Sequence, residues 1–288
     1  MKPLLLFVSL TLSIWAFEVN NGKSLIITFD DPHGMVTVHD RNISILPHPL
    51  RASEGFAVLP IDYYEPAHLL NAQWNNGQET VPFDINITAA AYPTEVLSVD
   101  SSKVTPPPEA LQRIADEKAE AEKIYNTITP TRYWDKPFIR PMDSITTSEY
   151  GSARTYNNSL KSYHGGVDFR AKTPLPILAS NSGTVVLAKD RYYAGGTIII
   201  DHGEGIYTCY FHMSRFDVHI GDHVQRGEII GLSGDTGRIT GPHLHFGVMI
   251  QGLQSDPLHF LAQVDTLFSN PMTMIQKRPK AHQYTTLK

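Results

Sequence analysis

Apolar and polar residues alternate over short stretches through most of the chain, which is the two-residue period of β-strands. In the first third, the stretches SLIITF, MVTVHD and FAVLPIDYY are separated by the turn signals DPHG, NNGQ and AYPT. After residue 137 the pattern returns as GTVVLAKD, GTIIIDHG, IYTCYFHM, EIIGLSG and HLHFGVMI. We therefore predict a mainly β protein, with a small all-β domain at residues 17–100 and a second β domain, an antiparallel sheet, at residues 131–268.

Residues 101–130 read differently, because three prolines precede a run of helix formers that begins at Glu109. Proline and an acidic residue in the first turn are typical of a helix start. The apolar residues of this run form one narrow stripe: Leu111, Ile114, Ala121 and Tyr125. The other faces are charged, so we expect a solvent-exposed helical connector. Helical periodicity returns only near Leu258.

The first 16 residues contain one lysine, an apolar run from Pro3 to Trp15, and then Ala16. The run is shorter than the roughly 20 residues that span a bilayer, and it resembles a secretory signal peptide cleaved after Ala16. An uncleaved N-terminal anchor is the alternative. We expect an exported, periplasmic protein with no stable membrane span after cleavage, and a polar C-terminal tail at residues 269–288.

Composition narrows the choice of partner. The chain is 41% hydrophobic and 18% charged, and its net charge is −5. Without a basic excess to neutralise phosphates, nucleic acid is not expected as a partner. Cys209 is the sole cysteine, so no intramolecular disulfide forms. It lies in the apolar segment IYTCYF, and we expect a core residue rather than a nucleophile.

The most distinctive stretch is TGPHLHFGV, where His243 and His245 lie two residues apart in a predicted strand. Residues two apart share one face of a strand, roughly 6–7 Å from each other. This spacing allows one imidazole to bind a metal while the other reaches a water on that metal. By itself the pattern H-x-H is weak evidence.

Two further segments offer ligands. SYHGGVDF holds His164 and Asp168, which would be about 13 Å apart in a regular strand. They share a metal only if the backbone bends, and the two intervening glycines permit a bulge or turn. His212 lies in the apolar strand of YFHMS, where an unpartnered imidazole is costly. Each segment alone also fits a structural role.

In chain order, H-x-x-x-D, His-Met-Ser and H-x-H resemble the lysostaphin-type, or LytM-type, zinc metallopeptidases. The similarity continues through SEYGSARTYNNSLKSYHGGVDFRAKTPLPILASNSGTVV, GGTIIIDHGEGIYTCYFHMS and VHIGDHVQRGEIIGLSGDTGRITGPHLHFGV, over about residues 146–258. An all-β domain and a helix before the catalytic domain are similar to several Gram-negative cell-shape members.

The resemblance implies one zinc ion per chain, with His164, Asp168 and His245 as ligands and one position open for water. It implies that His212 and His243 flank the open side. One would take a proton from water, and the other would stabilise the oxyanion or protonate the leaving amine; the sequence leaves open which does which.

The resemblance assigns an oxyanion-stabilising role in some members to a tyrosine before GGTIIIDHG. Both Tyr192 and Tyr193 match that position. We expect His202 to be structural, and His219, His223 and His259 not to be ligands.

The resemblance also implies the substrate. These enzymes cut peptides of peptidoglycan, and an exported protein favours the D-Ala–diaminopimelate crosslink. The alternatives are D,D-carboxypeptidase trimming of stem peptides at the same site, and a catalytically inactive wall-binding activator of another hydrolase. A carrier-type barrel-sandwich domain is a third, but the hairpin near GDHVQRGEIIG lacks the required tip lysine.

The role of residues 17–130 stays open. They restrict the substrate groove until a regulatory partner, proteolysis or domain motion releases it, or they position the enzyme on the cell wall. Three carboxylates in turn-like contexts are candidates to approach the metal: Asp30, Asp31 and Glu54.

Overall fold

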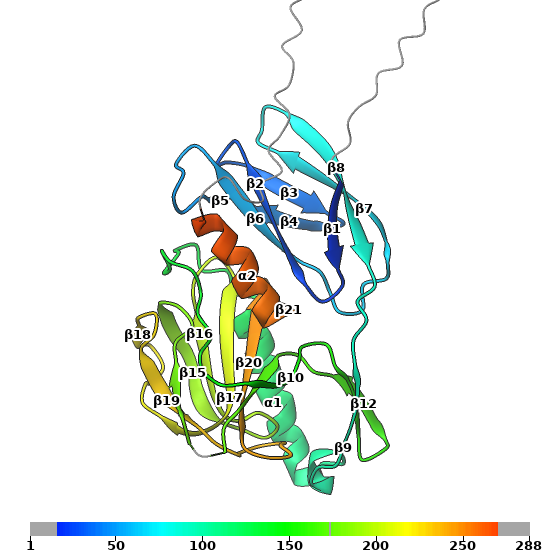
Figure 1. Ribbon diagram of the computed structural model, residues 1–288, viewed down its shortest axis with the longest axis vertical. Coiled ribbons are helices and arrows are strands. Elements are labelled where there is room, and N and C mark those ends of the chain that lie inside the picture. Colours follow the sequence, from blue (N-terminus) through cyan, green and yellow to red (C-terminus); the bar gives the residue numbers. More distant parts are fainter. Residues whose placement is uncertain (1–15, 173, 270–288) are drawn as a thin grey trace, which may run out of the picture.

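The structure, a computed structural model, describes residues 16–172 and 174–269. It is mainly β, as the alternating pattern predicts, and its described residues contain two α-helices (Figure 1). The predicted signal peptide and C-terminal tail lie outside the described residues, except for Ala16 and Ser269. Within the described part of the chain, neither helix has the length and apolar character needed to cross a bilayer.

Residues 16–88 form an N-terminal unit of two sheets, drawn at the top of Figure 1. The larger sheet has the order β1-β8-β7-β3-β4 and the smaller has the order β2-β6-β5. The strands are β1 (Ala16–Asn20), β2 (Ser24–Phe29), β3 (Met35–Val38), β4 (Arg41–Ser44), β5 (Leu46–Pro47), β6 (Gly55–Pro60), β7 (His68–Asn75) and β8 (Thr80–Thr88). The predicted strands SLIITF, MVTVHD and FAVLPIDYY coincide with β2, β3 and β6.

Residues 129–268 form a C-terminal unit around a ten-stranded sheet, whose main path has the order β10-β13-β20-β17-β16-β15-β18. Its strands are β10 (Thr146–Ser148), β13 (Val167–Arg170), β14 (Pro176–Leu178), β15 (Gly183–Arg191), β16 (Gly195–Asp201), β17 (Ile206–Phe216), β18 (His223–Val224), β19 (Ile229–Ser233), β20 (His243–Ile250) and β21 (Leu253–Ser255). All pairings within this sheet are antiparallel.

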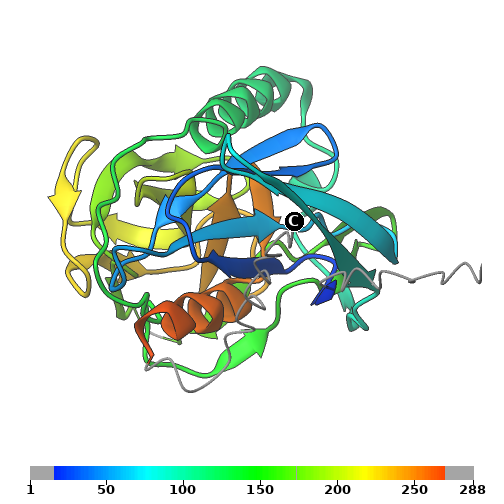
Figure 2. The ribbon, with the colours of Figure 1, turned by 90° about the horizontal axis from the view of Figure 1, so that it is seen from above.

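The large sheet buries both of its faces, because alternate side chains of its central strands enter different cores. Ile198 and Ile200 of β16 belong to one core, which also holds helix α2 (Pro257–Phe268). Ile199 belongs to the other core, against the end of helix α1 (Pro108–Tyr125). The two helices therefore cover opposite faces of the sheet (Figure 2). Burial on both faces explains why GTIIID reads as a continuous apolar run.

Strand β6 is shared between the two units. All six of its residues are buried, and they alternate between two cores. Phe56 and Val58 join the core of the C-terminal unit, while Ala57 and Leu59 join the core of the N-terminal unit. The units are therefore joined by a continuous apolar core, and deleting the N-terminal unit would expose part of the C-terminal core to water.

The structure revises the predicted boundary at residue 100 and the exposed connector. Strand β9 (Thr94–Leu97) pairs with β11 (Ala153–Tyr156), which pairs with β12 (Leu160–Tyr163), so residues near 95 belong to the C-terminal unit. A 3-10 turn (Ser101–Lys103) then leads to α1. The helix has the predicted extent, but it lies against the large sheet: the Tyr125 hydroxyl lies 3.4 Å from Cys209 Sγ. The pattern could not show this docking, because it depends on the opposite surface.

The contact with α1 also contributes to the burial of Cys209. Cys209 is buried, and burial raises the pKa of its thiol to about 12. A thiol with such a pKa is protonated at neutral pH and is a poor nucleophile. The expectation of a core cysteine is confirmed.

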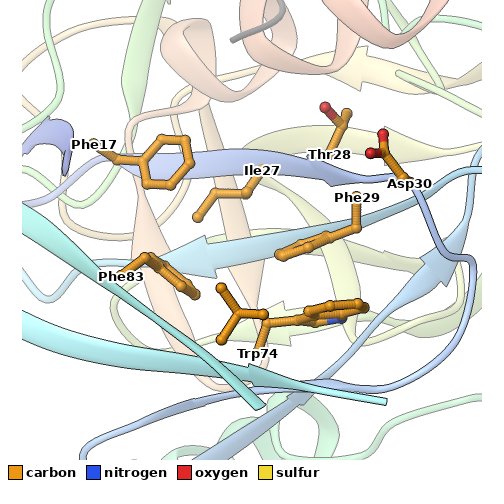
Figure 3. Close-up of a pocket in the computed structure, with 8 residues that line it drawn as sticks. Phe17, Ile27, Thr28, Phe29, Asp30, Trp74 and Phe83 are labelled. Carbon is orange, nitrogen blue, oxygen red and sulfur yellow. The ribbon is translucent and has the colours of Figure 1, made fainter. Parts of the chain in front are cut away.

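An apolar pocket opens between the sheets of the N-terminal unit (Figure 3). Phe17, Phe29 and Phe83 line it, and its volume of about 30 Å³ is room for about one water molecule. Asp30 lies at its edge.

The seam between the units contains a buried ion pair. Arg132 Nε donates to Glu204 Oε2 at 2.8 Å, with 17% and 6% of the two side chains exposed. The Arg132 guanidinium also lies 5.1 Å from the ring centroid of Phe56, a β6 residue. Burial raises the pKa of Glu204, and the hydrogen bond and charge of Arg132 oppose that rise.

We predict that Arg132→Ala lowers the free energy of unfolding by about 3–5 kcal/mol, because it leaves a buried carboxylate unpaired. Arg215→Ala is the matched control, since it breaks an exposed pair with Asp217 and should leave the free energy of unfolding nearly unchanged. Urea unfolding of the full chain measures both changes. Equal effects of the two substitutions would show that the seam does not depend on this pair.

Candidate metal centre and flanking histidines

Three side-chain atoms converge at one end of strands β13 and β20. His164 Nε2 lies 2.9 Å from Asp168 Oδ1 and 2.9 Å from His245 Nδ1, and these last two atoms are also 2.9 Å apart. They form a nearly equilateral triangle of two nitrogens and one oxygen. In a tetrahedral zinc site with bonds of about 2.0–2.1 Å, ligand atoms lie ~3.3 Å apart, so a slight outward movement fits this ion.

The bend expected between His164 and Asp168 is present, because β12 ends before the two glycines and β13 begins after them. Neither glycine has a positive φ, so the bend does not depend on a left-handed backbone conformation. A Cβ at Gly166 would lie 2.4 Å from the Phe246 carbonyl oxygen and 2.6 Å from His245 Nε2. Glycine is thus required because β13 passes directly against the strand that carries the H-x-H pattern.

Strand register places the ligands on one face. Asp168 is paired with His245 across β13 and β20. Their neighbours Phe169, Leu244 and Phe246 point to the opposite face and are fully buried in the core. The predicted alternation of side chains along β20 is therefore observed, and it orients His243 and His245 away from the core.

The donor set is chemically suited to a cation. His164 Nδ1 lies 2.8 Å from the carbonyl oxygen of Glu149, so this nitrogen carries the proton and donates it. His164 Nε2 then carries a lone pair, and it faces His245 Nδ1 at 2.9 Å. Two nitrogens at this distance repel each other unless a cation or a shared proton lies between them. The buried residues present therefore fit a bound metal ion.

Electrostatics keep the group in its metal-binding protonation state. Burial by itself would raise the pKa of Asp168, but the adjacent His164 and His245 lower it well below its usual range. Burial lowers the pKa of His245 to about 4. At neutral pH the group therefore offers one carboxylate and an uncharged His245 imidazole.

A second layer of polar residues, which the motifs do not reveal, holds the Asp168 carboxylate in place. Arg154 of β11 donates through Nη2 to Asp168 Oδ2 at 2.9 Å and through Nε to Glu95 Oε2 at 2.9 Å. Ser148 Oγ donates to Glu95 Oε1 at 2.7 Å and lies 3.2 Å from His164 Nδ1. Asp168 Oδ1 is thereby left facing the two histidines. Arg154 lies in the segment GSARTY, which carries the family resemblance, but nothing in the sequence singles out Glu95.

His212 reaches the site because β17 bulges there. The strand register against β16 shifts around this residue, and its φ is +65°, a left-handed value that histidine adopts more readily than most residues. A bulge inserts an extra residue and redirects its side chain. The ring centroid of His212 lies 4.8 Å from that of His243 and 6.1 Å from that of His245.

The glycine-rich loop 234–242 fixes the tautomers of both flanking histidines. His212 Nδ1 donates to the Thr236 carbonyl oxygen at 2.7 Å, and His243 Nδ1 donates to the Gly241 carbonyl oxygen at 2.7 Å. When neutral, each ring therefore presents an unprotonated Nε2, and His243 Nε2 lies 3.5 Å from Asp168 Oδ1. Burial, with the nearby histidines, lowers the pKa of His212 to about 3, so the imidazole is neutral at pH 7.

The structure distinguishes between the two candidate tyrosines. The Tyr192 hydroxyl donates to the Ser102 carbonyl oxygen at 2.9 Å, so it is engaged with the segment before α1. The Tyr193 ring packs on the Arg238 guanidinium at 4.8 Å, and Arg238 also lies 4.4 Å from the Tyr156 ring. Of the two, Tyr193 borders the loop that holds the flanking histidines.

The remaining histidines of the C-terminal unit have other partners. His202 is fully buried between the Ser182 carbonyl oxygen and the Thr208 hydroxyl, and burial lowers its pKa to about 4. His223 lies 2.9 Å from the Thr184 hydroxyl, and His259 donates to the Ser24 carbonyl oxygen. His219 lies beside Asp222 on the surface.

The three carboxylates that were candidates to approach the metal have partners or surroundings within the N-terminal unit. Asp31 accepts a hydrogen bond from Asn76 and lies beside His33. Glu54 pairs with Arg51 at 2.7 Å. Asp30 borders the apolar pocket of the N-terminal unit (Figure 3). In this structure, their surroundings do not support a role in blocking the metal centre.

The fold and the site together define a mainly β protein with a buried His/Asp/His metal-binding group. Residues 162–257 match the model of peptidase family M23. The segment that holds the predicted motifs thus matches this family.

The chain is similar to the peptidoglycan DD-endopeptidase ShyA of Vibrio cholerae, with 44% identity over 89 residues, which are 31% of this chain and 21% of ShyA. It is also similar to lysostaphin of Staphylococcus simulans, with 37% identity over 129 residues, covering 38% of this chain and 26% of lysostaphin. The chain thus spans about a fifth to a quarter of these relatives.

A solved structure of a putative peptidase M23 from Pseudomonas aeruginosa has a similar fold, with a TM-score of 0.66 and 23% identity. The match covers 84% of this chain and 95% of that chain. The arrangement of both units is therefore shared with that protein.

The polar residues behind Asp168 should affect how tightly the centre binds zinc. Glu95→Gln removes the charge that neutralises Arg154, so an uncompensated guanidinium then lies beside Asp168. We expect about tenfold weaker zinc binding, within the usual range for residues that orient a metal ligand. Competition with a fluorescent chelator measures this affinity. Glu149→Gln is the matched control, because its side chain is exposed and lies next to Ser148 in sequence. Equal affinities in both variants would exclude the orienting role.

Proposed function

We propose that the protein is a zinc-dependent peptidoglycan hydrolase that cleaves peptide crosslinks. The observation that carries this proposal is the triangle of His164 Nε2, Asp168 Oδ1 and His245 Nδ1, with two further histidines beside it. Two imidazoles and one carboxylate are a donor set of catalytic zinc sites. The matching family and the names of the relatives support a peptidase that acts on cell-wall peptides.

Zinc at this centre would supply a Lewis acid that lowers the pKa of water and polarises a peptide carbonyl. His164, Asp168 and His245 would hold it. Arg154 orients the Asp168 carboxylate: it binds Oδ2 and keeps Oδ1 directed at His164 and His245.

The fixed tautomers constrain what the flanking histidines do. Because Nδ1 of both His212 and His243 donates to a backbone carbonyl, neither ring offers an N–H from Nε2 while it is neutral. Each must first accept a proton, and only then can it donate a hydrogen bond to an oxyanion or a proton to a leaving amine. General base and general acid are therefore successive states of the same ring nitrogen.

The loops beside the site are suited to form the walls of a groove for an extended peptide. The glycine-rich loop approaches the loop after β15 so closely that a Cβ at Gly237 would lie 2.5 Å from the Gly195 nitrogen. Arg238, held between Tyr156 and Tyr193, connects the loop to the β11–β12 hairpin. We assign Tyr193, rather than Tyr192, to the substrate side, where it contacts the peptide or its oxyanion.

The proposal extends to the bond and the compartment. We favour the D-Ala–diaminopimelate crosslink and a periplasmic location, on the basis of the apolar N-terminal run and the similarity to a Vibrio DD-endopeptidase. The role of the N-terminal unit is then to position the enzyme on the wall, since its carboxylates are engaged elsewhere and its β6 is part of the core beneath the site.

The direct test is digestion of purified, crosslinked muropeptides by the full chain, with mass analysis of the products. Conversion of dimers to monomers, blocked by a chelator and restored by zinc, is the expected result. Loss of only a terminal D-Ala would identify a carboxypeptidase. No cleavage by zinc-loaded protein would reject the hydrolase and favour a binding role.

Site substitutions separate metal binding from proton transfer. We expect His164→Ala, Asp168→Ala and His245→Ala each to lose most of the zinc bound at this centre, together with the activity. His212→Ala and His243→Ala should keep zinc and lose activity by about 10²-fold or more, the usual size of a general acid–base contribution. His219→Ala is the control, because this side chain is exposed on the same unit.

Full activity of either the His212 or the His243 variant would remove that residue from the mechanism. Full zinc retention in all three ligand variants, measured by elemental analysis, would reject the metal centre itself.

A further inference from the structure

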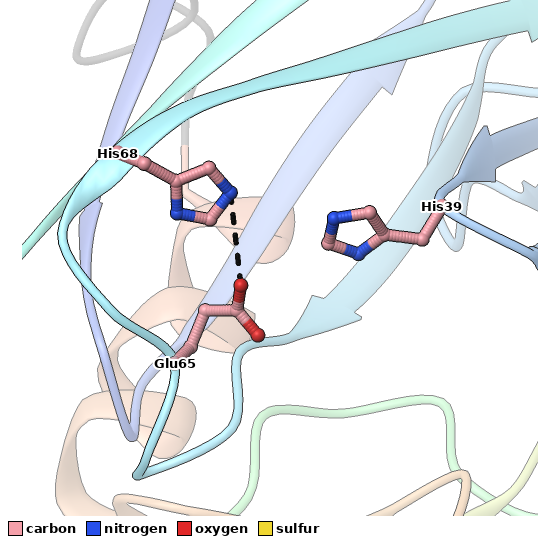
Figure 4. A group of neighbouring side chains, drawn as sticks. All are labelled: His39, Glu65 and His68. Atoms are coloured by element: carbon pink, nitrogen blue, oxygen red, sulfur yellow. Dashed lines mark ion pairs between the residues drawn. The ribbon is translucent and has the colours of Figure 1, made fainter.

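A second group of potential metal ligands lies in the N-terminal unit, on the surface away from the proposed active centre. It consists of His39, Glu65 and His68, whose ligand atoms all lie within 4.8 Å of one another (Figure 4). His39 comes from the turn between β3 and β4, and the other two come from the start of β7 and the loop before it. Residues far apart in sequence thus direct three donor groups at one point.

Backbone geometry explains how the group forms. His39 occupies the first position of the two-residue turn that joins Val38 to Arg41, and its φ is +50°. Histidine is among the residues that adopt this left-handed conformation more readily than most. The turn therefore places the imidazole beyond the end of the hairpin, where it faces His68 with ring centroids 6.2 Å apart.

One ligand is already oriented. His68 Nδ1 donates to the carbonyl oxygen of Pro66 at 2.8 Å, so its Nε2 is unprotonated in the neutral ring. That Nε2 lies 3.7 Å from Glu65 Oε1. Histidines that bind a metal usually donate their other ring N–H to a carboxylate, a backbone carbonyl or water, and His68 does so through Pro66.

The surroundings provide space for an ion and its waters. His39 and Glu65 line a hollow of about 390 Å³ that extends to the turn between β20 and β21. Asp62 also lines this hollow, and Arg41, another lining residue, donates to the Gln251 carbonyl oxygen at 3.2 Å. The hollow therefore touches both units and has room for the open coordination positions.

We propose that His39, Glu65 and His68 form a second metal site, which binds a divalent transition-metal ion such as Zn²⁺. Two imidazoles select against Ca²⁺ and Mg²⁺, which prefer oxygen ligands. The ion ties the β3–β4 turn to the start of β7 at the seam between the units. The site is independent of the proposed catalytic function, because no residue is shared.

Zinc binding to the full chain tests the site without any activity measurement. Equilibrium dialysis against Zn²⁺ should give two equivalents per chain for the unchanged protein. His39→Asn and His68→Gln should each give one; asparagine is chosen because it also tolerates the left-handed φ. Asp168→Ala should retain the second equivalent while losing the first.

His33→Ala is the matched control, since His33 lies beside the single carboxylate of Asp31 in the same unit and should not affect either equivalent. Circular dichroism without metal confirms that each variant is folded. In the Asp168→Ala background, added Zn²⁺ should raise the melting temperature, and His68→Gln should abolish that increase.

Saturation of the unchanged protein at one equivalent would overturn the proposal. So would a second equivalent that persists with unchanged affinity in the double variant His39→Asn, His68→Gln, because the ion would then be bound elsewhere.

Discussion

The convergence of three electron-rich atoms from His164, Asp168 and His245 is the constraint on which the surrounding structure depends. Atoms of this kind repel one another at 2.9 Å, so the fold must hold them together in the absence of a cation. The β13–β20 register provides two of them, and the close passage at Gly166 brings the third. Each further feature of the site either fixes a tautomer or compensates a charge.

That constraint explains why the sheet is covered so unevenly. One face packs against α2 and β6 in a shared apolar core, which supports the strands from behind. The other face is covered by α1 only beyond the site, where Tyr125 packs on Cys209 and Tyr207. His245 lies on this second face, because its neighbours Leu244 and Phe246 enter the core on the opposite face. The N-terminal unit contributes to that core, which makes it part of the structural support of the site.

The sequence contains the local parts of this arrangement. Alternation predicted β20 and the common face of His243 and His245, and helix formers predicted α1 from its first turn to Tyr125. Non-local features escaped prediction. Glu95 reaches the site only because β9 pairs in parallel with β11, some 60 residues later in the chain. The redirecting bulge at His212 and the division of β6 between two cores likewise depend on partners that no local pattern reveals.

The two histidine–carboxylate groups of the chain differ in what holds them. At the first group, burial removes competing water, and the loss of solvation is compensated by Arg154 and by backbone carbonyl groups. At the second, His39 is exposed and only His68 has a fixed tautomer, so an ion must order the remaining side chains as it binds. Ordering costs free energy, about 0.5–1.5 kcal/mol for each immobilised side chain. Similar donors therefore give a tighter site where the fold has already arranged them, and a weaker, more readily exchanging site at the seam.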